Sequence, residues 1–150
     1  MPDTTPPDDV TGLLDRYGAA WNGHDLDAIM AEHTPDSVFH LHAGAPEAVG
    51  STAVREAFAA TLEQWPDIHF AAEDVRIGPD HVTLRWTVTA TLATPLDLPD
   101  SSTAAPSGRQ VRFDAVDVLV IDGGRIARKD TYVDSLSLQQ QLAEHVPAAA

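Results

Sequence analysis

The sequence predicts an α+β domain in which a curved antiparallel sheet packs against helices. Helical periodicity dominates the first part of the chain, from residue 10 to about residue 66, and four long strand-like segments follow it. Helices followed by a meander of strands are typical of an α+β fold. The chain has 150 residues, of which 43% are hydrophobic, and this size suits one ordinary domain.

We expect residues 10–146 to form this single domain. Residues 1–9 contain three prolines and three aspartates and are predicted to be a disordered tail, and residues 147–150 are predicted to be a second tail. No internal repeat is present, and no long linker separates two patterned regions, so a second domain is not expected.

The first predicted helix begins at Val10. Its apolar side chains recur at helical spacing and form one continuous stripe, which consists of Val10, Leu13, Leu14, Tyr17 and Trp21. Asn22-Gly23 ends this helix, and Asp25 is placed to cap a second, short one. The second helix keeps the same spacing as far as His33 and stops at Pro35; its stripe consists of Leu26, Ile29, Met30 and His33.

A short strand and a third helix follow. Residues 37–42 (SVFHLH) alternate in polarity and are rich in strand formers, so they predict a strand. Ser51 is expected to cap the third helix, and Pro66 ends it. The buried stripe of this helix is expected to contain Val54, Phe58, Leu62 and Trp65.

The second half predicts four strands, at residues 68–77, 81–92, 111–121 and 125–133. Gly78-Pro79-Asp80 and Asp122-Gly123-Gly124 are typical hairpin turns and join them in pairs. The segment between the pairs, residues 93–110, contains three prolines and three serines and predicts a long mobile loop, which is either functional or disordered. A final helix is expected from about residue 135 to residue 145, with Asp134 as its cap.

Composition excludes several functional classes. The formal charge is -14, from 23 acidic and 9 basic residues, so neither a nucleic acid nor an anionic membrane is an expected partner. The absence of cysteine excludes disulfides, thiolate catalysis and thiolate metal sites. The N-terminus lacks the features of a signal peptide, and no stretch approaches the ~20 apolar residues of a membrane span, so we expect a cytoplasmic protein.

Two stretches of the sequence resemble a known superfamily: RYGAAWNGHDLDAIMAEHTPDSVF at residues 16–39 and VDVLVIDGGRIARKDTYVDSLSLQQQL at residues 116–142. They are similar to the nuclear-transport-factor-2-like proteins, and among these to the SnoaL-like polyketide cyclases, the ketosteroid isomerases and the limonene-epoxide-hydrolase-like enzymes. The resemblance covers residues 10–142. It implies a cone-shaped, ketosteroid-isomerase-like roll with a deep apolar cavity, and commonly a homodimer through the sheet. Because this fold hosts enzymes, binding modules and assembly domains, the resemblance specifies the fold better than the reaction.

Tyr17 and Asp117 are the candidates for an oxyanion hole. Tyr17 resembles the tyrosine with which ketosteroid isomerases bind the substrate oxyanion; a core tyrosine with a backbone partner is the alternative. Asp117 resembles the protonated aspartate of the same oxyanion hole. Strand alternation gives it the apolar surroundings in which a carboxyl group can donate a proton, unless a register shift of one residue turns it to solvent. The residues expected on its face are Phe113, Ala115, Leu119 and Ile121.

The resemblance does not extend to the general base of the ketosteroid isomerases. Leu41 takes the position of the isomerase aspartate and cannot accept a proton. His40 and His42 share one face of that strand, and a bulge next to Pro35 would turn one of them inward as a base. Their spacing would also allow a metal site together with His33. Without a clear carboxylate or a third ligand on the strand, no metal site is predicted, and no cofactor is expected because the glycine motifs that bind phosphates are absent.

Asp130, on the last strand, is a further candidate for the base. SnoaL-like cyclases and epoxide hydrolases keep an aspartate three residues before the acid that opens the last helix, but Thr131 takes that position here. Simple alternation places Lys129, Thr131 and Val133 inside and Asp130 outside. A bulge of one residue would bring Asp130 inward.

The predicted cavity wall is apolar and aromatic, which suits a flat polycyclic or extended hydrophobic ligand. The residues expected to bind it are Trp21, His33, Phe39, Leu41, Phe58, Trp86, Val88, Leu119, Lys129, Thr131 and Val133. We therefore expect cofactor-free acid–base chemistry next to a carbonyl group: isomerisation, aldol cyclisation or dehydration of a polyketide- or terpenoid-like substrate. A non-catalytic binding or dimerisation module with the same fold is the alternative.

Overall fold

The computed structural model describes residues 7–144, and these contain four helices and eight strands. The tail predictions for residues 1–6 and 147–150, and the domain end at residues 145–146, lie outside the described residues. The elements follow one another as α1 (Pro7–Asn22), α2 (Leu26–Ala31), β1 (His33–Leu41), β2 (Ala48–Val49), α3 (Ser51–Gln64), β3 (His69–Ile77), β4 (His81–Thr91), β5 (Leu96–Asp97), β6 (Thr103–Ala104), β7 (Gln110–Asp122), β8 (Arg125–Val133) and α4 (Ser135–Glu144).

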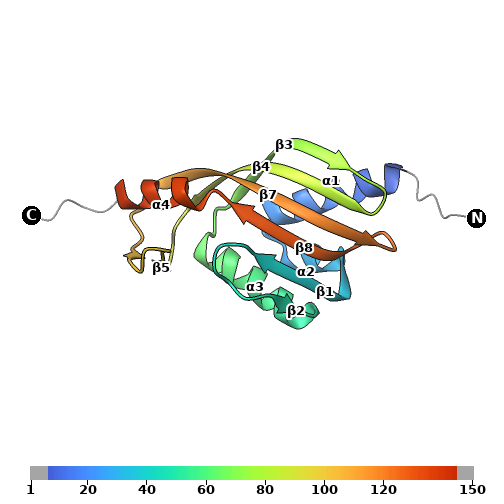
Figure 1. The fold of residues 1–150 in the computed structure, drawn as a ribbon, viewed down its shortest axis with the longest axis horizontal. Coiled ribbons are helices and arrows are strands. Elements are labelled where there is room, and N and C mark those ends of the chain that lie inside the picture. The colour runs from blue at the N-terminus through green and yellow to red at the C-terminus, as the bar shows by residue number, and fades with distance from the viewer. Residues whose placement is uncertain (1–6, 145–150) are drawn as a thin grey trace, which may run out of the picture.

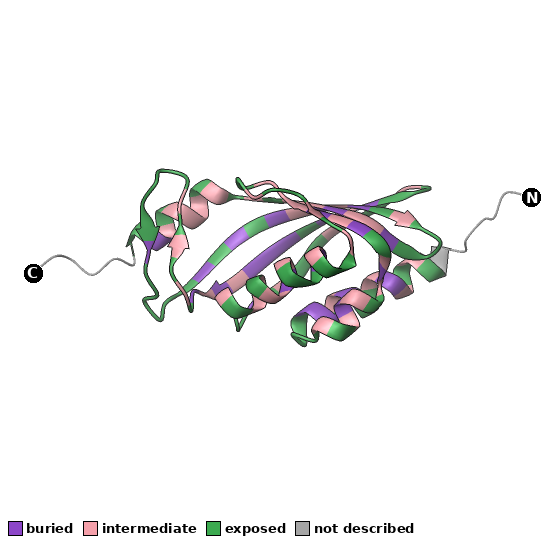
Figure 2. Cartoon of the chain, turned by 90° about the horizontal axis from the view of Figure 1, so that it is seen from below, coloured by how far each residue is buried: buried purple, intermediate pink, exposed green. Residues whose placement is uncertain are grey.

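A curved sheet of six strands, in the order β2-β1-β8-β7-β4-β3, forms one layer of the molecule. All neighbours in it are antiparallel except β1 and β8, which run parallel. Helices α1, α2 and α3 lie behind this sheet in Figure 1, and Figure 2 shows the sheet arching over them from the side. The predicted α+β fold with a curved, mainly antiparallel sheet is confirmed.

Helix α1 buries the predicted stripe against the sheet. Leu13, Tyr17 and Trp21 are all at least 95% buried, because their spacing places them on one helical face. The helix begins at Pro7, three residues before the predicted start, so residues 7–9 are helical rather than part of a tail. Proline suits the first turn of a helix, where its missing N–H group has no intrahelical partner to lose.

The short second helix ends earlier than predicted. Asp25 caps α2 as expected and accepts a hydrogen bond from the Ala28 N–H group at 3.1 Å, but the helix stops at Ala31. His33 already belongs to β1, and Pro35 lies within that strand, where the pairing with β8 is irregular between His33 and Val38. An irregular segment tolerates Pro35, which has no N–H group to donate to a ladder.

The start of α3 also differs from its prediction. Gly50 precedes this helix with a φ of 89°, and Ser51 is its first residue and not its cap. No side chain makes a cap hydrogen bond there. Val54 and Phe58 are fully buried and Trp65 is nearly so, as the predicted stripe required.

The four long strands match their predicted positions to within one residue at each end. Strand β8 contains a bulge, because Val120 of β7 pairs with Arg128 while Ile121 pairs with Ile126, which leaves Ala127 as an extra residue. As a result Ile126 and Lys129 are both buried on the inner side, although three positions separate them.

The segment between β4 and β7 is more ordered than the predicted mobile loop. It contains the small antiparallel hairpin of β5 and β6, in which Leu96 pairs with Ala104, and Ala104 is buried. At the end of the chain Asp134 caps α4, since its carboxylate accepts the Ser137 N–H group at 3.1 Å. None of the helices described in residues 7–144 is long and apolar enough to cross a membrane.

Candidate functional site

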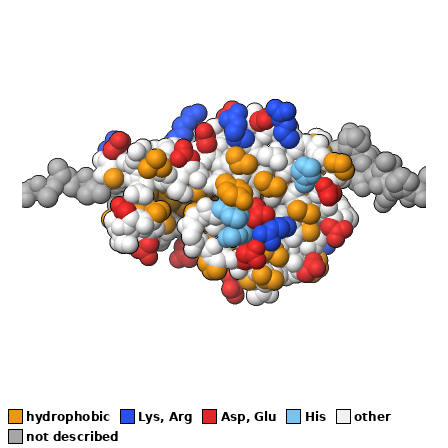
Figure 3. Space-filling model, in the orientation of Figure 1, with side chains coloured by type: hydrophobic (Ala, Val, Ile, Leu, Met, Phe, Trp, Pro, Cys, Tyr) orange, Lys and Arg blue, Asp and Glu red, His pale blue; other side chains and the backbone are white. Residues whose placement is uncertain are grey.

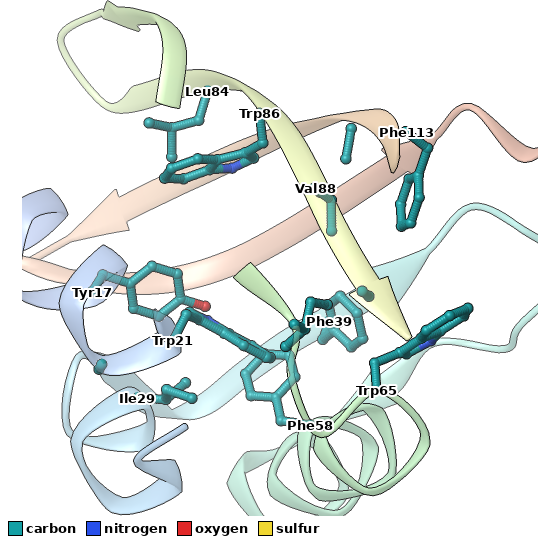
Figure 4. Packing of buried hydrophobic residues seen from close by; sticks show 14 of the residues in the cluster. Tyr17, Trp21, Ile29, Phe39, Phe58, Trp65, Leu84, Trp86, Val88 and Phe113 are labelled. Carbon is teal, nitrogen blue, oxygen red and sulfur yellow. The ribbon is translucent and has the colours of Figure 1, made fainter. Parts of the chain in front are cut away.

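A cavity of about 340 Å³ lies between the inner face of the sheet and the helices. Its wall is largely aromatic, with Trp21 from α1, Phe58 and Trp65 from α3, Trp86 from β4 and Phe113 from β7. Figure 4 shows these rings projecting from opposite sides into one region. The volume lies at the lower end of the range of roughly 300–1,000 Å³ that is usual for small-molecule sites.

Most of the residues predicted to bind substrate line this cavity. They are Trp21, Phe39, Leu41, Phe58, Trp86, Val88, Lys129, Thr131 and Val133. His33 and Leu119 do not line it: Leu119 is fully buried in the core, and His33 is hydrogen-bonded to Tyr17. Phe113 and Ala115 line it too and were missed, although alternation with Asp117 was enough to place them there. Leu96, Leu98 and Pro99 come from the segment that was predicted to be a mobile loop, and no sequence signal placed them.

Asp117 faces the cavity, as predicted, and is only 4% exposed. The Trp86 indole N–H group donates to its Oδ2 at 2.9 Å, and the Thr131 hydroxyl group donates to its Oδ1 at 2.5 Å. The Lys129 ammonium group lies 3.5 Å from Oδ2. The predicted apolar surroundings are therefore wrong, because β4 and β8 bring two donors and a cation to this side chain. Such neighbours suit a carboxylate that accepts protons better than a carboxylic acid that donates them.

Lys129 carries the positive charge of the site and is 6% exposed. Its Nζ donates to the Tyr17 hydroxyl oxygen at 3.2 Å and lies between 4.9 and 5.5 Å from the ring centres of Tyr17, Trp21 and Phe58. Burial by itself lowers the pKa of Lys129, but the neighbouring Asp117 carboxylate and Tyr17 hydroxyl outweigh it, and the pKa is raised. The side chain is therefore a buried cation, held by a carboxylate and by three aromatic faces.

Tyr17 lies behind Lys129 and does not line the cavity. Its hydroxyl group is 2.9 Å from His33 Nε2, and burial raises the pKa of Tyr17. Burial, with the nearby charge of Lys129, lowers the pKa of His33 to about 3, so the imidazole is neutral. Its Nε2 therefore accepts a hydrogen bond from the Tyr17 hydroxyl group. The structure thus places Tyr17 as a support for Lys129, away from the position of a substrate oxyanion that the resemblance implied.

The three candidate bases, His40, His42 and Asp130, lie on the outer face of the sheet. Phe39 and Leu41 point into the cavity, so the histidines between and beyond them point away. The expectation that a bulge would turn one of these three groups inward is wrong. The irregularity near Pro35 ends before Val38, and the bulge at Ala127 leaves Asp130 outside. The metal set of His33 with His40 and His42, which the histidine spacing allowed but the sequence did not predict, is not formed, since His33 is buried in the core.

Few ionisable groups reach the cavity. Among the described residues that line it, only Asp97, Asp117 and Lys129 carry ionisable side chains. Asp97 belongs to β5, is exposed, and accepts a hydrogen bond from Thr103 at 2.9 Å. Any acid–base chemistry in the cavity therefore depends on Asp117 and Lys129.

Comparison with known proteins gives a family match. A family model described as a SnoaL-like domain matches residues 14–129. No curated protein matches the chain in a sequence comparison.

Solved structures share the fold over nearly the whole chain. A candidate SnoaL-like polyketide cyclase from Jannaschia sp. CCS1 is 18% identical, with a TM-score of 0.80, and the match covers 98% of this chain and 99% of that one. AclR, a candidate hydroxylase from Streptomyces galilaeus, is 25% identical with a TM-score of 0.75 and coverages of 95% and 100%. IdmH, a candidate polyketide cyclase from Streptomyces antibioticus, is 20% identical with a TM-score of 0.72 and coverages of 89% and 98%.

Proposed function

This chain belongs to the SnoaL-like domain family, and we propose that its cavity performs acid–base chemistry next to a carbonyl group of a hydrophobic small molecule. The observation that carries the proposal is the pair of Asp117 and Lys129. A carboxylate and an ammonium group lie 3.5 Å apart, both at least 94% buried, in the wall of an otherwise largely apolar cavity. The cyclase- or isomerase-type function that the family fold suggests requires a base and an oxyanion partner of this kind.

In the proposed reaction Asp117 removes a proton from the carbon next to the carbonyl group. The C–H bond breaks, its electron pair moves to the carbonyl oxygen, and Lys129 donates a hydrogen bond to the resulting enolate oxygen. Oδ1 of Asp117 is the proton acceptor, since it receives only the Thr131 hydroxyl group, whereas Oδ2 receives Trp86 and faces Lys129.

The fate of the enolate distinguishes three reactions with the same first step. Return of the proton from Asp117 to another carbon is an isomerisation. Attack of the enolate carbon on a second carbonyl group of the same molecule, followed by transfer of the proton from Asp117 to the new alkoxide oxygen, is an aldol cyclisation. Loss of a hydroxyl group from the neighbouring carbon, which leaves as water with the proton from Asp117, is a dehydration. The aromatic wall excludes water from all three, which strengthens the interaction between Lys129 and the enolate. We propose a polyketide- or terpenoid-like substrate because flat, fused rings fit such a wall.

Deuterium exchange at a carbon next to a carbonyl group tests the first step. 2-Tetralone is a flat, apolar ketone, and its exchange in D₂O is followed by proton NMR. The wild-type protein should accelerate this exchange, and Asp117→Asn should reduce the acceleration by roughly 100-fold or more, as expected for loss of a general base. Asp114→Asn, which alters an exposed carboxylate of β7 that does not line the cavity, is the matched control and should exchange like the wild type. Equal rates for the wild type and Asp117→Asn would contradict the proposal.

A non-catalytic binding protein is the second candidate function. It is favoured by one observation: both oxygens of Asp117 already have partners, and no imidazole lines the cavity among the described residues. This alternative predicts that 2-tetralone quenches the fluorescence of the cavity tryptophans while its protons exchange at the rate seen without protein. Binding together with accelerated exchange excludes it.

We also propose that the protein is a homodimer that pairs through the outer face of the sheet. Val116, Val118 and Val120 form an apolar row along the outer side of β7, and Tyr132 of β8 lies beside Val116 in the pairing register. Val120 is 38% exposed and Tyr132 is 48% exposed, so this row is only partly covered within one chain. The cytoplasmic location stays a prediction from the sequence.

A further inference from the structure

Three side chains with metal-binding atoms meet on the outer face of the sheet, on the side away from the cavity. His40 and His42 come from β1, and Asp130 comes from β8. The parallel pairing of these strands places His40 directly beside Asp130, and the two-residue period of a strand places His42 on the same face. Figure 3 shows this face, where two adjacent histidines lie among acidic and basic side chains. The proposed function uses none of these residues.

The geometry of the cluster is close to that of a metal site. The candidate ligand atoms of the three residues all lie within 4.8 Å of one another, and His42 Nε2 is 2.8 Å from Asp130 Oδ1. Each side chain is only partly exposed, at 27% for each histidine and 17% for Asp130. A metal ion bound to all three at about 2.0–2.2 Å would replace the contact between His42 and Asp130 and would draw the three ligand atoms closer together.

The surroundings hold these groups in place. The rings of His40 and His42 have centres 3.9 Å apart, and the Tyr132 ring stacks on His42 at 4.1 Å with planes 7° apart. Arg128 donates to Asp130 Oδ2 at 2.8 Å and to Oδ1 at 3.1 Å, and so fixes the orientation of its carboxylate, in the manner of the outer partners of metal ligands.

The charge of the cluster also favours a cation. Glu47 lies at its edge, with Oε1 3.9 Å from His40 Nδ1 and 2.7 Å from Arg128. The carboxylates of Asp130 and Glu47 outnumber the guanidinium group of Arg128, so the cluster is negative while its histidines are neutral.

We propose that His40, His42 and Asp130 bind a divalent transition-metal ion, with Glu47 at the edge of the site. Two imidazoles and one or two carboxylates match the preferences of zinc and of its neighbours cobalt and nickel, whereas magnesium and calcium prefer oxygen ligands alone. The ion joins β1 to β8 and leaves the cavity on the other face unchanged. The site is thus independent of the proposed catalysis.

Isothermal titration of the purified protein with zinc chloride tests this site. The wild type should bind a single zinc ion per chain at the cluster, and cobalt in its place should show visible absorption of a site with nitrogen and oxygen ligands. Because even outer partners of metal ligands change affinity by roughly 10- to 100-fold, His42→Ala should weaken zinc binding by at least that factor. His40→Ala is the second variant, since it removes one ligand but leaves the contact between His42 and Asp130 intact.

His81→Ala is the matched control. His81 is the exposed first residue of β4, and its Nδ1 lies 3.0 Å from Asp80 Oδ1, so this pair offers two ligands rather than three. This variant should bind zinc like the wild type. If His81→Ala and His42→Ala lose zinc affinity equally, scattered surface histidines bind the ion and the proposal is wrong. If a folded double variant, His40→Ala with His42→Ala, binds zinc as tightly as the wild type, the proposal is also overturned. A wild type that does not bind zinc would overturn it as well.

Discussion

A row of buried polar groups connects the core of this protein to its cavity: His33, Tyr17, Lys129 and Asp117. Tyr17 and Lys129 each have a partner on either side, and the row ends at the neutral imidazole of His33 and at the carboxylate of Asp117. A charged ammonium group in such a place is stable only while these partners remain, because an unpaired buried charge costs several kcal/mol. The row therefore both stabilises the fold and presents a cation to a ligand.

Tyr17→Phe removes the hydroxyl group in the middle of this row. Lys129 loses one acceptor and His33 loses its only hydrogen-bond partner among the described residues, so the free energy of unfolding should fall by about 1–3 kcal/mol in urea denaturation. The affinity for 2-tetralone should change little, because Tyr17 does not line the cavity. Tyr132→Phe, at the exposed second tyrosine, is the control. A stable Tyr17→Phe protein that no longer binds the ketone would instead place this hydroxyl group in contact with the ligand.

His33 gives the protein a defined sensitivity to acid. Its pKa is about 3 in the folded state, against an ordinary value of 6.5, so the folded state binds fewer protons than the unfolded state between these pH values. The stability that neutral His33 contributes is therefore complete above about pH 6.5 and is lost as the pH falls towards 3, at up to about 1.4 kcal/mol per pH unit.

The variant His33→Gln tests this contribution, since its amide oxygen accepts the Tyr17 hydroxyl group without titrating. Unfolding free energies measured between pH 7 and pH 4 should fall less steeply for His33→Gln than for the wild type. Parallel curves would show that His33 is not held neutral.

Strand β8 contributes side chains to sites on both faces of the sheet. The bulge at Ala127 sets its phase, so that Lys129 and Thr131 line the cavity while Arg128 and Asp130 belong to the outer cluster. A shift of one residue would exchange these two sets and would leave each site without its charged groups.

The hairpin of β5 and β6 covers one end of the cavity, and Leu98 follows β5 in its wall. Leu98→Ser should weaken 2-tetralone binding roughly tenfold in a fluorescence titration, because apolar contact area with the ligand is lost. Leu136→Ser is the control, since Leu136 of α4 is 66% exposed and does not line the cavity. Equal affinities of the two variants would show that the hairpin does not contact the ligand.

Sequence patterns along individual strands and helices were sufficient to predict much of the site. Alternation alone placed Asp117, Lys129, Thr131 and Val133 inside and Asp130 outside, and the helical stripe placed Trp21 in the wall. Alternation along one strand gives no information about the register between neighbouring strands. It therefore did not predict that Trp86, Thr131 and Lys129 would surround Asp117.

The same missing register explains why the outer cluster and the role of Tyr17 were not predicted. Asp130 is 88 residues from His42 along the chain, and only the pairing of β1 with β8 brings them together. The role of Tyr17 was misjudged because nothing in its own helix indicates that Lys129 lies between it and the cavity. The prediction also missed the end of α2 at Ala31 and the start of α3 after Gly50. At these two boundaries, strand pairing and backbone conformation prevailed over the expected breaker and cap residues.

For the whole molecule, the proposed homodimer through the outer face of the sheet is open to a direct test. Sedimentation velocity should show a dimer for the wild type, and Val118→Asp should shift it to a monomer, because a carboxylate in the apolar row repels its copy in a protein of formal charge -14. Leu136→Asp adds the same charge on α4 and should remain dimeric. A dimer that persists in Val118→Asp would place the interface elsewhere.

The proposed reaction requires Asp117 and Lys129 to hold a carbonyl group and its neighbouring carbon. A crystal structure of the protein with 2-naphthol, a flat analogue of the enolate of 2-tetralone, tests this arrangement. The naphthol oxygen should lie within hydrogen-bonding distance of Lys129 Nζ, with the adjacent ring carbon facing Asp117 Oδ1 and the rings against Trp86 and Phe39. A naphthol oxygen that points to the mouth of the cavity, with Lys129 and Asp117 contacting only each other, would contradict it.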